Sequence, residues 1–248
     1  MKGLLRWLTW CAVALLALQL FFVARIASMA VLAPQSTTFQ RSEAWRITAE
    51  KGDLRWSQQW VSYPQISDHL KRAVIASEDD GFSHHDGVDW DALEKAWEKN
   101  TKAEQRAAAR KPPTSTRLSA KQPRPPKVVG GSTITQQLAK NLLLSGERTL
   151  LRKGQEFVLT LVLEACLSKQ RILEIYLNNV EWGEGVFGAE AAAQHYFHKP
   201  AARLSALEAA RLAVMLPRPR HFEKLPYSAY LSGRAGVITG RMPDAQLP

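Results

Sequence analysis

The sequence predicts a mainly α-helical protein with one membrane-spanning helix at its N-terminus. An almost wholly apolar run opens the chain from Leu4 to Ala33, apolar residues recur at three- and four-residue spacing over 150–169 and 169–180, and 201–215 is rich in Ala and Leu. Alternating β-branched patterns are scarce, although the stretch 45–56 permits a short hairpin. With 248 residues, 46% of them apolar, the chain can build one good-sized core.

The first element is the apolar run. Its 18 uncharged residues, 7–24, are close to the minimum for a membrane span, and Arg25 can extend the span by directing its charge toward the interface. Lys2 and Arg6 precede the run, which predicts a cytoplasmic N-terminus and a body on the outer side. The alternative is a signal peptide cleaved within 27–33. The length of the run favours an uncleaved anchor.

Four parts follow from these patterns. We expect a cytoplasmic tip and transmembrane anchor over 1–33, a juxtamembrane segment over 34–64, the main domain over 65–226 and a C-terminal tail over 227–248. The tail carries no functional signal. Cys11 lies in the anchor and Cys166 in an expected core helix, so the two cannot plausibly form a disulfide.

The segment 130–141 (GGSTITQQLAKN) is the most informative stretch of the main domain. Its two aliphatic residues lie four apart, so a helix that begins near Ser132 buries both on one side. Ser132 or Thr133 can cap this helix, and the free N–H groups of a helix N-terminus suit an anion. Lys140 adds a positive charge about two turns further on.

Four other segments accompany it in a fixed order. They are 78–89 (EDDGFSHHDGVD), 152–156 (RKGQE), 172–178 (ILEIYLN) with Gly183, Gly188 and Tyr196-Phe197, and 204–210 (LSALEAA) with Pro217 and Pro219. Together with 130–141 they resemble the five motifs of the peptidoglycan glycosyltransferases, glycosyltransferase family 51, over roughly residues 65–226. Because no transpeptidase domain follows, the resemblance is to the monofunctional biosynthetic transglycosylases.

The resemblance implies a lysozyme-like helical glycosyltransferase domain behind the anchor. Members of this family polymerise lipid II into β-1,4 glycan strands, with inversion and release of undecaprenyl diphosphate, at the outer, periplasmic face of the bacterial inner membrane. The implied partners are lipid II, the growing strand, the membrane and proteins of cell division or elongation, with no nucleic acid.

Two carboxylates are the candidate catalytic residues. Glu78 follows three apolar residues, so it is expected at the end of a buried helix, where desolvation would raise its pKa. Glu156 follows Arg152 by four residues and Lys153 by three, a spacing that also occurs in ordinary surface ion pairs. The resemblance assigns Glu78 as general base and Glu156 as a second catalytic residue.

The candidate substrate-binding residues divide into cations and hydrogen-bonding groups. Displacement of a diphosphate requires cations to hold the leaving group and polar groups to align two sugars. The cations are Lys140, Arg148, Arg152 and Lys153, and the polar set is Ser132, Thr133, Gln137 and Asn141. His84 and His85 have no metal-ligand spacing, so we expect no protein-bound metal; Mg²⁺ or Mn²⁺ would arrive with the diphosphate.

The stretch 95–127 departs from the family pattern. It holds ten basic and two acidic residues, and five of the thirteen prolines of the chain. The part through about Arg110 favours a polar helix and the remainder an exposed linker. Lipid head groups and the substrate's diphosphate are the nearest anions behind an anchor, although a solvated insertion without a specific role explains the stretch equally well.

Two other functions stay open at this point. A lysozyme-like glycan-cleaving enzyme needs a protonated acid and no cation cluster, and the four basic residues within 140–153 disfavour it. A catalytically idle scaffold of the cell-wall machinery is the second alternative, and the presence of both Glu78 and Glu156 disfavours that reading.

Overall fold

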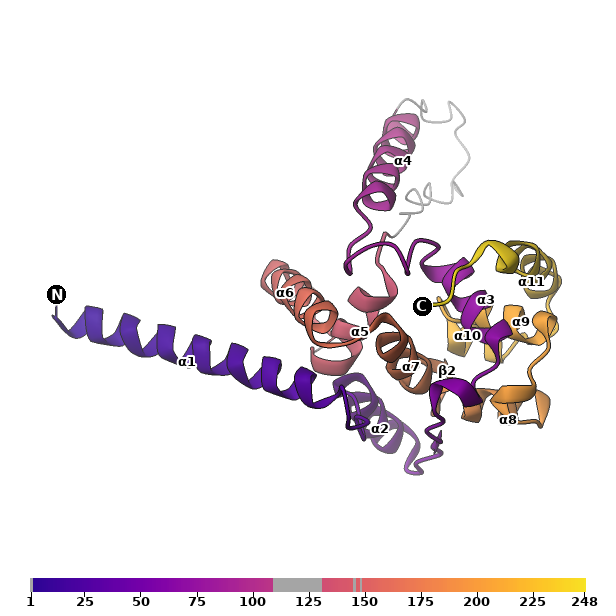
Figure 1. Ribbon diagram of the computed structural model, residues 1–248, viewed down its shortest axis with the longest axis horizontal. Coiled ribbons are helices and arrows are strands. Elements are labelled where there is room, and N and C mark those ends of the chain that lie inside the picture. Colours follow the sequence, from indigo (N-terminus) through magenta and orange to yellow (C-terminus); the bar gives the residue numbers. More distant parts are fainter. Residues whose placement is uncertain (1, 109–130, 145, 148) are drawn as a thin grey trace, which may run out of the picture.

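Helices make up most of the structure, which confirms the mainly α-helical prediction. The computed structural model describes residues 2–108, 131–144, 146–147 and 149–248. Helix α1 (Lys2–Ser28) extends away from the body as a long arm, and α4 (Trp90–Ala108) projects from it in another direction (Figure 1). The other helices gather into the body.

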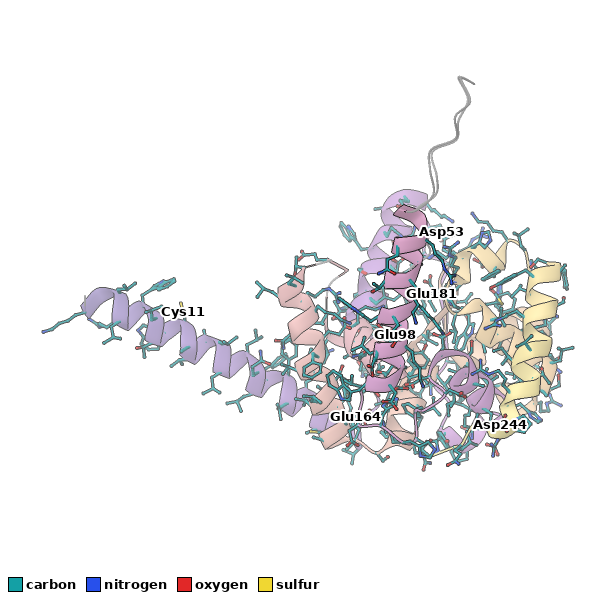
Figure 2. All side chains as sticks on the ribbon, turned by 90° about the horizontal axis from the view of Figure 1, so that it is seen from above. Cys11, Asp53, Glu98, Glu164, Glu181 and Asp244 are labelled. Atoms are coloured by element: carbon teal, nitrogen blue, oxygen red, sulfur yellow. The ribbon has the colours of Figure 1, made fainter. Side chains whose placement is uncertain are left out.

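Among the described residues, α1 is the one helix long and apolar enough to cross a membrane. Most of its side chains are exposed, and Cys11 lies where the helix stands clear of the body (Figure 2). Its C-terminal end is docked, however. The amides of Gln19 and Gln155 of α6 (Leu150–Cys166) exchange two hydrogen bonds, at 3.1 and 3.0 Å, and Ile26 and Met29 are buried in the core.

The hairpin considered for 45–56 is wrong, because α2 (Thr38–Lys51) runs through most of that stretch. Thr37 and Gln40 form a reciprocal capping box at its start, and Gly52 ends it in the left-handed conformation. The capping signals at the two ends of α2 therefore favour a helix over the hairpin that the β-branched residues between them permitted. The first strand, β1 (Ser57–Gln58), begins just beyond this stretch.

The core is built from two groups of helices. In one, α3 (Asp68–Glu78) and α11 (Ala229–Arg241) pack against α9 (Ala206–Met215). In the other, α5 (Ile134–Leu143) packs against α6 and α7 (Lys169–Asn179). The remaining elements are η1 (Tyr63–Gln65), β2 (Glu181–Gly183), β3 (Val186–Phe187), α8 (Ala189–Phe197), η2 (Ala201–Arg203), α10 (Pro219–Glu223) and η3 (Met242–Asp244).

The body also contains a small three-stranded sheet. Strand β3 pairs with β1 in parallel and with β2 antiparallel. The amide of Asn178 on α7 donates to the carbonyl of Val61 and accepts from its N–H, both at 2.9 Å. Trp182 is fully buried and donates to the carbonyl of Leu212 at 3.1 Å. These contacts fix the segments on which the site is built.

Gly188, between β3 and α8, is required by the fold. Its φ is +84°, and a Cβ there would lie 2.7 Å from the carbonyl oxygen of Asn178. We expect Gly188→Ala to lower the free energy of unfolding by about 2–3 kcal/mol, because both the backbone conformation and the contact are unfavourable for alanine. Thermal unfolding in detergent micelles measures this.

Gly233→Ala in α11 is the matched control. A Cβ at Gly233 meets nothing within 4 Å, so alanine should stabilise the helix by about 0.5–1 kcal/mol. Equal unfolding temperatures for the two variants would contradict the assignment of Gly188 as a conformationally constrained position.

Candidate active site

The end of α3 and the start of α5 are joined by Asp79. One carboxylate oxygen of Asp79 accepts from the backbone N–H of Ile134 at 2.9 Å, and the other lies 2.8 Å from Nε2 of His85. His85 accepts the N–H of Gly87 on Nδ1 at 3.2 Å, so Nε2 carries the proton and donates to Asp79. His85 is thus a structural residue that holds Asp79 and the loop together.

Glu78 is the last residue of α3 and lies in the wall of a pocket of about 400 Å³. Its carboxylate accepts a hydrogen bond from Nε2 of Gln137 at 3.1 Å, and Tyr176 orients that amide by donating to its Oε1 at 3.0 Å. Partial burial raises the pKa of Glu78, and the hydrogen bond from Gln137 opposes this effect. A carboxylate with a raised pKa suits proton transfer near neutral pH.

Thr133 begins α5 and is committed to the fold. Its hydroxyl accepts from the N–H of Gln136 at 3.1 Å, in a reciprocal capping box, and donates to the carbonyl of Gly87 at 2.6 Å. The hydroxyl hydrogen is therefore already used within the protein. Ser132, one residue earlier, is exposed and lines the pocket of Glu78.

Glu156, on the second turn of α6, is 3% exposed and lines a second pocket of about 620 Å³. Arg152 donates to one of its oxygens at 2.8 Å, and Lys153 forms an ion pair with the other. Lys140 and Asn141 line the same pocket from α5. Burial lowers the pKa of Lys140, an effect opposed by the negative charge of Glu156. Glu156 is thus paired with two of the three cations of this pocket, which Glu147 and Glu181 also line.

The two pockets adjoin. Ser132 lines both, and Gln137, which lines the second pocket, is hydrogen-bonded to Glu78 in the first. A carboxylate able to take a proton therefore lies next to a cavity lined by three cations, Lys140, Arg152 and Lys153. This combination suits the attack of a hydroxyl group on a centre that loses an anionic leaving group.

Nine of the ten residues expected at the site lie in these two pockets. Glu78 and Thr133 line the first, Ser132 lines both, and Gln137, Lys140, Asn141, Arg152, Lys153 and Glu156 line the second. The tenth, Arg148, lies outside the described residues, as does the segment 109–127 of the basic stretch. The first part of that stretch forms α4, as expected.

Several lining residues carried no usable signal in the sequence. Lys95 and Lys99 of α4 and Arg241 of α11 line the first pocket, and Thr38, Phe39 and Ser42 of α2 line the second. The lysines were visible only as part of a long basic run, and no local pattern relates Arg241 to residues 161 positions earlier. Among the described residues, no group of three or more His, Cys, Asp or Glu side chains could hold a metal ion.

Comparisons with known proteins agree with this geometry. Residues 46–109 and 116–243 match the transglycosylase family. A Burkholderia thailandensis protein named biosynthetic peptidoglycan transglycosylase is 50% identical over 100% of this chain and 90% of its own length. Proteins of the same name from Burkholderia lata and Paraburkholderia phytofirmans are 50% and 47% identical, over 98% and 99% of this chain and 92% and 95% of their own lengths.

These matches confirm the resemblance seen in the five motifs. The match to the Burkholderia thailandensis protein extends over both pockets and over the helices that build them. The chain therefore belongs to the transglycosylase family, and it is a glycosyltransferase of peptidoglycan synthesis with a lysozyme-like helical fold.

Proposed function

We propose that the enzyme polymerises lipid II, with Glu78 as general base. The observation that carries the proposal is the adjacency of the two pockets at Ser132, with Glu78 in one and the cations around Glu156 in the other. The acceptor sugar occupies the pocket of Glu78, and the donor's diphosphate occupies the pocket of Lys140, Arg152 and Lys153.

The reaction proposed is a single displacement. Glu78 takes the proton of the acceptor's 4-hydroxyl, and the oxygen attacks the anomeric carbon of the donor N-acetylmuramic acid. The bond between that carbon and the diphosphate oxygen breaks, and undecaprenyl diphosphate leaves from the opposite face. The α-linked donor thereby gives a β-1,4 bond. Lys140, Arg152 and Lys153 stabilise the leaving charge, and Ser132, Gln137 and Asn141 orient the sugars.

Purified enzyme incubated with labelled lipid II tests this proposal. Polymer on a gel, with release of undecaprenyl diphosphate, is the expected product. Digestion of preformed glycan would favour the cleaving enzyme, for which the raised pKa of Glu78 also suits a general acid. Neither reaction, across several detergents and Mg²⁺ or Mn²⁺ concentrations, would favour the scaffold. We propose that such a metal ion enters with the diphosphate.

Tyr176→Phe is expected to shift the acid limb of the pH profile of kcat/KM to higher pH, by up to about one unit. The base must be ionised, so the rate rises with pH through the pKa of Glu78. Without the Tyr176 hydroxyl the Gln137 amide loses its orientation, which weakens the hydrogen bond that favours ionised Glu78. The pKa then rises further, and the limb moves upward.

Tyr63→Phe is the matched control for this measurement. The Tyr63 hydroxyl is also buried, but it has no hydrogen-bond partner among the described residues. Its removal should leave the acid limb where it is. A limb that stays in place in Tyr176→Phe, or moves equally in both variants, would contradict the chain from Tyr176 through Gln137 to Glu78.

We also propose that α1 crosses the inner membrane once, with Lys2 on the cytoplasmic side and the catalytic domain in the periplasm. The length and apolarity of α1 and the basic residues at its start support this orientation. Alkaline phosphatase fused after Pro248 should be active in intact cells. An inactive but stable fusion would reverse the assigned topology.

A further inference from the structure

Helix α4 presents two different faces. Trp90, Leu93 and Trp97 are 63%, 43% and 75% exposed and share one side of the helix. Ala92, Lys95, Ala96 and Lys99, on the other side, line the pocket of Glu78. Figure 1 shows α4 standing out from the body. Lys95 and Lys99 are exposed to solvent on the side of α4 that lines the pocket.

The N-terminal end of α4 is fixed beside the pocket of Glu78. The carboxylate of Asp89 accepts the N–H of Ala92 at 2.8 Å, which caps the helix. Gly131, next to Ser132, packs so closely that a Cβ there would lie 3.5 Å from Cα of Leu93 and 3.6 Å from Cβ of Ala96. The first turns of α4 are thus held against the loop that enters α5, and Lys95 and Lys99 are held at the mouth of the pocket.

Four carboxylates (Glu78, Asp79, Asp80 and Asp89) and three cations (Lys95, Lys99 and Arg241) line this pocket. Asp79 is engaged by His85 and the N–H of Ile134, and Asp89 caps α4. Asp80 forms an ion pair with Arg241 at 3.2 Å.

Two of the three cations have no carboxylate partner among the described residues. Lys95 and Lys99 form no ion pair with a carboxylate among the described side chains, whereas Lys102, one turn further along α4, pairs with Glu98 at 2.9 Å. Two positive charges therefore face the cavity that contains the base.

We propose that Lys95 and Lys99 form a second anion-binding site, which holds an anionic group of the acceptor. The inference rests on the proposed function, because it assigns the pocket of Glu78 to the acceptor. An acceptor lipid II carries two such groups, the diphosphate and the carboxylates of its stem peptide. When the lysines bind either group, they hold the acceptor so that its 4-hydroxyl lies near Glu78. The lysines themselves do not contact the reacting atoms.

Acceptor kinetics of the double variant Lys95→Gln/Lys99→Gln test this site. The labelled donor is a lipid-linked disaccharide whose own 4-hydroxyl is inverted, so that it cannot act as acceptor, and lipid II is varied as the acceptor. We expect the acceptor KM to rise about 10-fold, with kcat and the donor KM near those of the parent. Glutamine keeps the helix propensity of lysine, and circular dichroism checks that α4 is retained.

Lys102→Gln is the matched control, because Lys102 belongs to the same helix but does not line the pocket. Its acceptor KM should equal that of the parent. An unchanged acceptor KM in the double variant would overturn the proposal, and so would a loss of kcat alone or a rise in the donor KM alone. A parent enzyme without polymerising activity would instead refute the proposed function.

A second acceptor identifies the anionic group. Lipid II whose stem carboxylates have been converted to amides keeps only the diphosphate. If the lysines bind the diphosphate, the 10-fold difference between parent and double variant persists with this acceptor. If they bind the carboxylates, the parent loses the same factor and the double variant loses nothing more. Both results support the site, and each assigns one source.

Discussion

Glu78→Gln is expected to reduce lipid II polymerisation by about 10²- to 10⁴-fold, the usual contribution of a positioned general base. Glutamine keeps the shape of the side chain but cannot take a proton from the acceptor hydroxyl. The fold should not suffer. Because burial raises the pKa of Glu78, its ionised form is disfavoured in the folded state, and a neutral side chain removes that penalty. Initial polymerisation rates and unfolding temperatures measure both effects.

The stability expectation has a definite sign. A carboxyl whose pKa is higher in the folded state than in the unfolded state lowers stability as the pH rises from the unfolded pKa to the folded one. At neutral pH the variant should therefore unfold at the same temperature as the parent, or at a higher one. Asp80→Asn is the control for both measurements, because it also replaces a carboxylate of the same pocket by an amide, but one that is paired with Arg241. If Glu78→Gln polymerises at the parent rate, Glu78 is not the general base.

Glu156→Gln is expected to lower the polymerisation rate about 100-fold and the free energy of unfolding by about 2 kcal/mol. The 3% exposed carboxylate holds Arg152 and Lys153 in place, and an amide leaves these cations without a counter-charge. Disordered cations stabilise a leaving diphosphate less well. Single-turnover rates and unfolding in detergent measure the two losses.

The same change should move the alkaline limb of the rate to lower pH. Burial already lowers the pKa of Lys140, and the charge of Glu156 raises it. Without that charge the pKa falls further, and the ammonium group is lost at a lower pH. Adding Arg152→Gln should restore part of the stability but none of the activity.

Glu174→Gln serves as the control for this second prediction. Glu174 forms a comparable ion pair with Arg171 at 2.9 Å but lines neither pocket. Its loss should leave polymerisation unchanged. Full activity of Glu156→Gln, or an equal loss of activity in Glu174→Gln, would assign Glu156 a structural role alone.

Local patterns were sufficient for residues whose role depends on near neighbours in the chain. The caps and apolar spacing of 130–141 predicted α5, and the interval between Arg152 and Glu156 predicted their contact. The choice between an ordinary surface ion pair and a buried one was different. It depended on burial, and burial is set by helices that are distant in the sequence.

Residues that depend on distant neighbours escaped detection. Arg241 reaches the first pocket because α11 packs against α3, and Lys95 reaches it because Gly131 fits against α4. Neither residue belongs to a local motif. The hairpin considered for 45–56 failed for a related reason, since the capping signal at Thr37 lies eight residues before the stretch on which that expectation rested.

The docking of α1 onto α6 sets the height of the cleft above the bilayer. Gln19 lies within the apolar run 7–24 and is joined to Gln155, so this end of α6 is held beside the proposed membrane-spanning part of α1. With the proposed topology, Glu156, the residue after Gln155, is therefore held close to the membrane. In the proposed reaction, a diphosphate whose lipid tail stays in the membrane then reaches Arg152 and Lys153 without the lipid being lifted out of the bilayer.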